Sequence, residues 1–278
     1  MKRIMSIQDI SCIGKCSCGV ALPIISSMGI ECAIVPTAVL STHTMFSGFT
    51  FRDLTDDMVG IKEHWLSEGF KFDAIYSGYL GSTRQIDIVS DFFDTFGKGI
   101  TKIVDPAMAD NGKLYAGFDE DFALEMTRLC SKADIILPNI SEASFILGEE
   151  YPGEDASIEH LQNLLIKLSK LGPKHTVITG VNLGDDKFGF IGYDSAENEF
   201  YSYSTKKVHM KSHGTGDVFA STFTGALTRG KNIYDALTIA ADFTSECIAD
   251  TYNDPEAVNY GVNFETQIPF LLKRLELI

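Results

Sequence analysis

Short apolar runs alternate along the chain with longer segments in which apolar residues recur every three or four positions. The short runs predict buried strands, and the longer period predicts helices with one apolar face. Residues 53–68 illustrate the helical pattern, with Leu54, Met58, Ile61 and Trp65 on one side. The predicted strands are 2–7, 31–40, 74–77, 102–104, 135–137 and 175–179, followed by a hairpin of 187–194 with 199–206. The predicted helices are 16–28, 53–68, 84–96, 119–130 and 158–171, and the chain after Gly214 is expected to be all helical.

This alternation predicts an α/β fold with a mostly parallel sheet and helices on both of its faces. The chain contains no linker-like, repetitive or low-complexity stretch, so we expect a single domain over residues 1–278. In such sheets ligands bind beyond the carboxyl ends of the strands. Candidate chemistry is therefore sought where predicted strands end.

Composition narrows the class of protein. The 278 residues are 45% hydrophobic and 22% charged, which is typical of a globular chain. A formal charge of −15 argues against a nucleic-acid or anionic membrane partner. The first residues lack the long apolar stretch of a secretory signal, which favours a cytoplasmic protein. Cys12, Cys16 and Cys18 lack the paired spacing of a zinc site, so we expect the cysteines to be free thiols.

A glycine-rich turn precedes the C-terminal helices, in the run Ser212-His213-Gly214-Thr215-Gly216-Asp217. The two glycines let backbone N–H groups converge on an anion, because no Cβ obstructs them. Asp217 lies within reach of such an anion, where a carboxylate can accept the proton of an attacking hydroxyl group. An N-cap aspartate after a glycine turn would give the same sequence. The run predicts either a phosphoryl-transfer site with Asp217 as base or an ordinary helix cap.

Two further polar clusters follow predicted strands. Asp105 and Asp110 come after strand 102–104 and can both face a magnesium-bound triphosphate. Asn139 and Glu142 follow strand 135–137 and open a helix with oxygen ligands on one side. A capping box explains Asn139 and Glu142 equally well. Because all these clusters follow strands of one sheet, we expect them at the same edge.

Five segments, in chain order, carry a resemblance to a known family. They are Thr37-Ala-Val-Leu-Ser-Thr-His-Thr44, Ser77-Gly-Tyr-Leu-Gly-Ser82, Asp105-Pro-x-Met-x-Asp110, Asn139-x-x-Glu142 and Gly214-Thr-Gly-Asp217. Together they resemble the pyridoxal kinase family of the ribokinase-like superfamily, over most of the chain. The resemblance implies a three-layer α/β sandwich, a homodimer, and ATP- and Mg²⁺-dependent phosphorylation of the 5′-hydroxymethyl group of a vitamin B6 vitamer (pyridoxamine, pyridoxine or pyridoxal).

The resemblance also implies individual roles. Asp217 would be the base, and the backbone of Gly214, Thr215 and Gly216 would form the anion hole. The implied vitamer contacts are Asp9, Cys16, His43, Thr44 and Tyr79, with Tyr79 stacking on the pyridine ring and a flap near 41–52 covering it. The implied ATP contacts are Asp105, Asp110, Asn139 and Thr179, and the implied metal ligands are Glu142 and Asp105.

The chain departs from the family pattern at two positions. Asp9 stands where the family commonly has serine, and its carboxylate could pair with a protonated pyridine nitrogen or an exocyclic amine. We therefore expect pyridoxamine or pyridoxine to be preferred over pyridoxal. Leu137 replaces a threonine-rich stretch, which bears on a possible K⁺ requirement.

Two alternative functions stay open at this point. A hydroxymethylpyrimidine kinase of thiamine synthesis shares the phosphate motifs, but would have a Gly-Gly-rich segment where residues 9–14 stand. A non-catalytic vitamer-binding protein would not need a carboxylate beside an anion hole.

Overall fold

The computed structural model describes residues 1–184, 186–210 and 213–278. Contacts within the chain group it into two compact units, each described by itself. Unit 1 comprises Met1–Tyr76 and Lys206–Ile278, and unit 2 comprises Ser77–Thr205. The single domain expected from the sequence stays a prediction.

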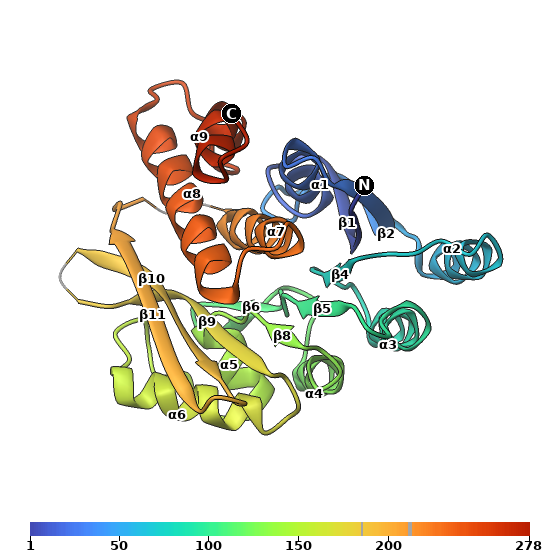
Figure 1. The fold of residues 1–278 in the computed structure, drawn as a ribbon, viewed down its shortest axis with the longest axis horizontal. Coiled ribbons are helices and arrows are strands. Elements are labelled where there is room, and N and C mark those ends of the chain that lie inside the picture. Colours follow the sequence, from blue (N-terminus) through green and yellow to red (C-terminus); the bar gives the residue numbers. More distant parts are fainter. Residues whose placement is uncertain (185, 211–212) are drawn as a thin grey trace. The chain divides into compact units, whose positions relative to one another are not determined.

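Unit 1 is built on a parallel strand pair, β1 and β2, whose register runs from Arg3 opposite Glu31 to Ile13 opposite Thr42. Strand β4 neighbours β1, and the short β3 runs antiparallel to β2. Helix α1 packs on β1 and β2, and α7 contacts both α1 and α8, which lies beside it in Figure 1. The elements are β1 (Arg3–Ile13), α1 (Cys18–Ser27), β2 (Glu31–Thr42), β3 (Phe51–Asp53), α2 (Thr55–Ser67), β4 (Ala74–Ser77), α7 (Thr215–Thr228), α8 (Ile233–Asn253) and α9 (Phe264–Arg274).

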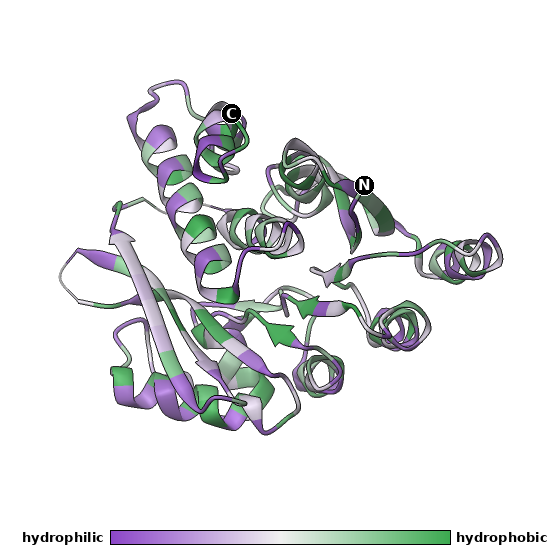
Figure 2. Cartoon of the chain, viewed as in Figure 1, coloured by the Kyte–Doolittle hydropathy of each residue, from purple (hydrophilic) through white to green (hydrophobic). Residues whose placement is uncertain are grey.

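Unit 2 carries three parallel neighbours, β5, β8 and β9, followed by the antiparallel β10 and then β11. Helices α5 and α6 pack on β9. Figure 2 shows β8 as mainly hydrophobic, whereas α6 alternates hydrophobic and hydrophilic positions. The elements are α3 (Thr83–Phe96), β5 (Thr101–Val104), β6 (Ala109–Asp110), β7 (Lys113–Leu114), α4 (Glu120–Cys130), β8 (Ile135–Ile136), α5 (Ile140–Leu147), α6 (Ile158–Ser169), β9 (His175–Asn182), β10 (Lys187–Asp194) and β11 (Glu199–Lys206).

Burial explains why these segments form these elements. The four residues of β4 are all buried, as expected for a strand covered on both faces. In α6 the buried residues Leu161, Leu164, Leu165 and Leu168 fall on one face. Among the described residues, every helix is too short or too polar to span a bilayer.

The predicted elements are largely confirmed, with corrections at their ends. Strand β4 and the hairpin strands β10 and β11 have the predicted bounds. Strand β1 continues beyond residue 7 to Ile13, although Gln8, Asp9 and Ser11 are polar, because those side chains are buried with polar partners. The short strands β3, β6 and β7 were not predicted, since two or three residues are too few to show a period.

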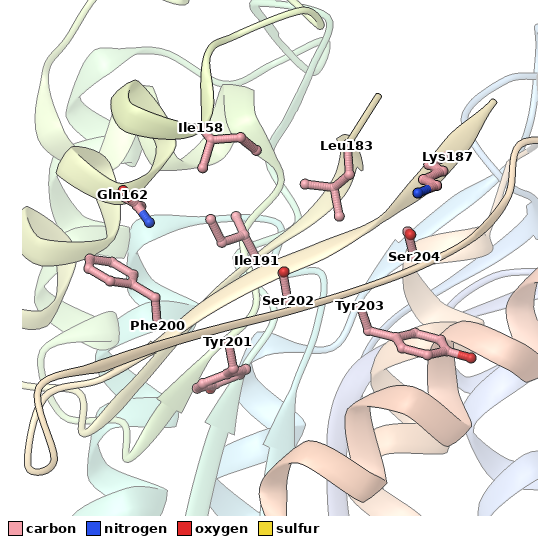
Figure 3. A pocket seen from close by; sticks show the side chains of 10 residues that line it. All are labelled: Ile158, Gln162, Leu183, Lys187, Ile191, Phe200, Tyr201, Ser202, Tyr203 and Ser204. Carbon is pink, nitrogen blue, oxygen red and sulfur yellow. The ribbon is translucent and has the colours of Figure 1, made fainter. Parts of the chain in front are cut away.

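Unit 2 also contains a cavity of about 610 Å³ between α6 and the β10–β11 hairpin. Ile158 of α6 and Ile191 of β10 face it from opposite sides (Figure 3). None of the predicted site residues lines this cavity. It therefore plays no part in the site described next.

Candidate active site

The predicted glycine turn forms the N-terminus of α7 in unit 1. Gly214 is the N-cap residue and has a left-handed conformation with φ of 73°. A Cβ built at this position would lie 1.8 Å from the carbonyl oxygen of Lys15, so glycine allows the loop before α1 to pack against the turn. Asp217 lies in the first turn of α7, so its reading as an N-cap residue is wrong. Ser212 lies outside the described residues.

The environment of Asp217 suits a base. Its carboxylate accepts a hydrogen bond from the backbone N–H of Ser17. Burial, and secondly the charge of Asp9, raise its pKa to about 7. A general base works best when its pKa lies near the working pH, because it is then both ionised and able to take up a proton. The helix N-terminus beside it favours anions, as phosphate groups are.

Asp9 lies on β1 at a break in its pairing with β2. The register shifts between Gln8 and Ile10, and the Asp9 side chain is only 4% exposed. The hydroxyl of Ser11 donates to Oδ2 of Asp9 over 3.0 Å, and the Ser17 hydroxyl also bonds this carboxylate. Burial raises the pKa of Asp9 despite these bonds. The structure therefore brings Asp9 and Asp217 together within unit 1.

The neighbouring cysteines are not activated. Burial and the charges of Asp217 and Asp9 raise the pKa of the Cys16 thiol to about 12. Burial also raises the pKa of Cys18, whose Sγ lies 3.5 Å from the carbonyl oxygen of Gln8. A protonated thiol is a weak nucleophile. Cys16 is thus suited to line a pocket, as the resemblance implies, and not to attack a substrate.

His43 anchors the segment that was predicted to form a flap. Its Nδ1 accepts from the backbone N–H of Met45 at 3.2 Å, so Nε2 carries the proton and donates to the carbonyl of Tyr260 at 3.0 Å. Burial lowers the pKa of His43, which favours the neutral form of the ring. The rings of Phe46 and His213 lie 5.3 and 5.9 Å away.

The flap prediction also concerned Thr44, which is exposed. Tyr260, which meets His43 from the C-terminal part of unit 1, was missed by sequence reasoning. Its position 217 residues from His43 left no local signal for this contact.

In unit 2, Asp105 and Asn139 lie just beyond the carboxyl ends of neighbouring strands, whereas Thr179 lies inside β9, which continues to Asn182 beyond the predicted end at residue 179. Asp105 follows β5 and Asn139 follows β8, and these parallel strands pair residue by residue. Asn139 and Thr179 form a parallel bridge of their own. The expectation that these polar clusters meet at a common edge is confirmed for this unit.

Asn139 and Glu142 form the capping box that the sequence allowed. Oδ1 of Asn139 accepts from the Glu142 N–H at 2.9 Å, and Oε2 of Glu142 accepts from the Asn139 N–H at 2.8 Å. Both side chains also hold the loop after β5. Oε1 of Glu142 accepts from the Met108 N–H at 3.2 Å, and Nδ2 of Asn139 donates to the Ala109 carbonyl at 2.8 Å. The two residues therefore fix the shape of the loop that contains Asp105 and Asp110.

The remainder of that loop is a tight turn. Asp110 is exposed, and its Oδ1 accepts from the Asn111 N–H at 2.9 Å. The next residue, Gly112, donates its N–H to the Ser141 hydroxyl at 2.8 Å. Ser141 is a further residue of the cluster that sequence reasoning missed, although it lies inside the Asn139-x-x-Glu142 motif.

Tyr79 is half-buried in unit 2 at the end of the segment after β4. Its ring centroid lies 5.6 Å from that of Phe118, with the two rings tilted by 33°. Phe118 in turn stacks on Phe122 at 3.9 Å. This aromatic support holds Tyr79, and Phe118 was not anticipated from the sequence.

The carboxylates of unit 2 fit a magnesium ion that arrives with a nucleotide. Burial, and secondly the charge of Asp105, raise the pKa of Glu142, a repulsion that a nearby divalent cation would offset. Among the described residues, no group of three or more His, Cys, Asp or Glu is arranged to hold a metal. Mg²⁺ commonly takes only one or two carboxylates and completes its shell with water and substrate phosphates.

Comparison with known proteins places the chain in a family. The family model described as phosphomethylpyrimidine kinase matches residues 22–262. The chain belongs to this family. A Bacteroides thetaiotaomicron protein with the same description is 39% identical, and its structure covers 97% of this chain and 93% of its own with a TM-score of 0.92. An orthorhombic form of that protein contains pyridoxal.

The names of other relatives include both pyridoxal kinase and hydroxymethylpyrimidine kinase. Pyridoxal kinase from Lactobacillus plantarum is 28% identical, with a TM-score of 0.90 over 98% of this chain and 97% of its own. A Bacillus subtilis hydroxymethylpyrimidine/phosphomethylpyrimidine kinase is 27% identical over 67% of each chain. The chain spans only 42% of the length of an Arabidopsis thaliana bifunctional thiamine biosynthetic enzyme that it also matches, at 25% identity over 82% of this chain. These likenesses confirm the predicted ribokinase-like α/β fold and a kinase of this family.

Proposed function

We propose that this protein transfers a phosphoryl group from ATP to the 5′-hydroxymethyl group of a vitamin B6 vitamer. The observation that carries the proposal is the placement of Asp217 in the first turn of α7, three residues after the left-handed Gly214 that caps the helix. A carboxylate at that point can take a proton from a hydroxyl group while the helix N-terminus receives the transferred group. The raised pKa of Asp217, about 7, allows it to do so near neutral pH.

Each part of the proposed reaction has residues suited to it. Asp217 takes the proton of the substrate hydroxyl, and the N–H groups of Gly214, Thr215 and Gly216 stabilise the charge on the group in transfer. Asp105 and Glu142 would hold Mg²⁺, which when bound neutralises charge on the ATP phosphates. Asn139, Asp110 and Thr179 would contact the nucleotide.

The choice of a B6 vitamer is supported by the pyridoxal found in the 39% identical Bacteroides protein. On the vitamer side, we propose that Cys16, His43, Thr44 and Tyr79 contact the ring and its substituents. Both ring nitrogens of His43 are already engaged within the protein, so its contact with the vitamer would be through the face or edge of the ring. The homodimer, the cytoplasmic location and any role of K⁺ stay predictions.

A second candidate is a hydroxymethylpyrimidine kinase. The family description and the Bacillus subtilis relative favour it. The absence of a Gly-Gly-rich segment at residues 9–14 speaks against it.

One experiment separates the two. The protein is incubated with Mg-ATP and an equimolar pool of pyridoxal, pyridoxamine, pyridoxine and hydroxymethylpyrimidine, and the phosphorylated products are identified by mass. We expect one or more vitamer 5′-phosphates. Phosphorylation of the pyrimidine alone would overturn the B6 assignment, and no phosphorylated product together with no ADP formation would overturn the kinase proposal.

A further inference from the structure

Ser17 has an unusual backbone conformation next to the proposed base. It is the N-cap residue of α1, with φ of 49° and ψ of −134°, and its side chain makes no capping hydrogen bond. A residue with a Cβ rarely adopts a positive φ, and such strain persists only where surrounding structure imposes it. The Ser17 side chain is buried, so its hydroxyl cannot be satisfied by bulk water.

The backbone and the side chain of Ser17 instead interact with the carboxylates of Asp217 and Asp9. Its backbone N–H donates to Asp217, and its hydroxyl bonds Asp9. The close approach of the neighbouring Lys15 carbonyl to Gly214 independently places this loop against the start of α7. Ser17 therefore links the two carboxylates through a single residue.

No cationic side chain among the described residues forms an ion pair with Asp9. Its partners are the hydroxyl groups of Ser11 and Ser17 and its own backbone N–H. Lys15, the nearest lysine in sequence, directs its ammonium group to Glu265 at 2.9 Å and Asn263 at 3.2 Å. The other titratable groups around the pair come from three segments of unit 1: Cys16 and Cys18, whose thiol pKa values are raised, His43, whose pKa is lowered, and, beside His43, His213.

A buried carboxylate beside a half-buried one, without a counter-ion, is costly, because each disfavours ionisation of the other. A carboxylate can accept about four hydrogen bonds, so Asp9 retains capacity beyond its present partners. A substrate cation would supply both the missing charge and the missing donor. A buried charge is stable when it is paired and hydrogen-bonded in this way.

We propose that Asp9, Ser17 and Asp217 act as one unit that selects a substrate carrying a protonated nitrogen, which pairs with Asp9 and readies Asp217 as the base. This deepens the proposed function and rests on it. Among the B6 vitamers, pyridoxamine has an aliphatic amine that is protonated near neutral pH, whereas pyridoxine has a hydroxyl group at that place. The cation offsets the charge of Asp9, so Asp217 loses a proton more readily with the amine substrate than with the neutral one.

The first test compares kcat/KM for pyridoxamine and pyridoxine at saturating Mg-ATP. We expect Asp9→Asn to lower kcat/KM for pyridoxamine about ten- to a hundredfold more than for pyridoxine, the scale of a charge-assisted hydrogen bond. Glu63→Gln, which removes one negative charge from an exposed position on α2, is the matched control and should leave the ratio unchanged. An unchanged ratio in Asp9→Asn overturns the proposal.

The second test follows the pH dependence of kcat, which reports groups in the enzyme–substrate complex. In the unsubstituted protein, the acidic limb of the plot of kcat against pH should lie at lower pH with pyridoxamine than with pyridoxine. Asp9→Asn should abolish this difference. Coincident limbs for the two substrates in the unsubstituted protein contradict the coupling of Asp9 to Asp217.

Ser17→Gly tests the linking residue itself. Glycine tolerates φ of 49° and keeps the N–H to Asp217, so only the hydroxyl bond to Asp9 is lost. We expect a reduced preference for pyridoxamine and a narrower gap between the two pH limbs, with a thermal midpoint no lower than that of the unsubstituted protein. If both quantities stay unchanged, Ser17 has no positioning role.

Calorimetric titration with each vitamer in the absence of ATP separates failure of this inference from failure of the proposed function. A protein that binds pyridoxamine more tightly than pyridoxine, and loses that preference in Asp9→Asn, supports charge selection even if neither vitamer is phosphorylated. Equal binding of both vitamers before and after the substitution refutes charge selection, whatever the turnover.

Discussion

Replacing Asp217 by asparagine tests the proposed base through both catalysis and stability. The amide keeps the shape of the side chain and an oxygen that can accept the Ser17 N–H. It cannot accept a proton from the substrate hydroxyl at neutral pH. We expect kcat to fall by about 10²–10⁴, the usual contribution of a positioned general base, with little change in vitamer or ATP binding.

Because the pKa of Asp217 is raised, the substitution that lowers activity is expected to increase folding stability. Below its ordinary value of 3.8 the residue is protonated in both the folded and the unfolded protein, so it makes no difference. Between 3.8 and about 7 the unfolded chain ionises while the folded protein holds the proton, so folding stability falls as pH rises. At about 1.36 kcal/mol per pH unit, the penalty reaches an upper value of about 4 kcal/mol above neutrality.

Asp217→Asn removes this penalty. Thermal or denaturant unfolding should therefore show the variant more stable than the unsubstituted protein, with a gain about 2–3 kcal/mol larger at pH 8 than at pH 5. Asp121→Asn makes the same chemical change at an exposed position in the first turn of α4 and should leave activity unchanged. Full turnover in Asp217→Asn would refute the assignment of the base. An equal stability change at both pH values would refute the argument from burial.

Three further variants probe the turn, the loop and the flap. Gly214→Ala should strongly lower the thermal midpoint and the activity, because the added Cβ would lie 1.8 Å from the carbonyl oxygen of Lys15. The control is Gly48→Ala, at a position with a similar φ and no atom within 4 Å of the added Cβ, which should show only the conformational cost of about 1 kcal/mol. Asn139→Ala should lose about 1 kcal/mol of stability and raise KM for ATP, because the loop that carries the nucleotide contacts loses its hydrogen bond to Asn139. Asn232→Ala removes the equivalent cap of α8 and should lose stability without changing KM for ATP. His43→Ala should raise KM for the vitamer several-fold through release of the segment it anchors, and an unchanged KM would contradict the flap role.

Local pattern predicted most of the secondary structure because each element has its own period and boundary residues. The fully buried β4, the leucine face of α6 and the Asn139–Glu142 capping box could all be predicted from neighbouring residues. The polar second half of β1 could not. Its hydrophilic residues become strand residues only because partners from other segments bury and bond them.

The sequence alone determined the α/β class, the strand–helix order and the identity of the glycine turn with its aspartate, since each depends on residues close in the chain. Only the tertiary structure decided that Ser17 interacts with both Asp9 and Asp217, and that the Tyr260 carbonyl accepts a hydrogen bond from His43. It also decided that Asn139 and Glu142 form hydrogen bonds with the loop after β5. Those contacts arise between segments that folding brings together, and the pKa of Asp217 depends on the burial and neighbouring charge that result. Its chemistry as a base is therefore a property of the folded unit, whereas its presence in the turn is a property of the sequence.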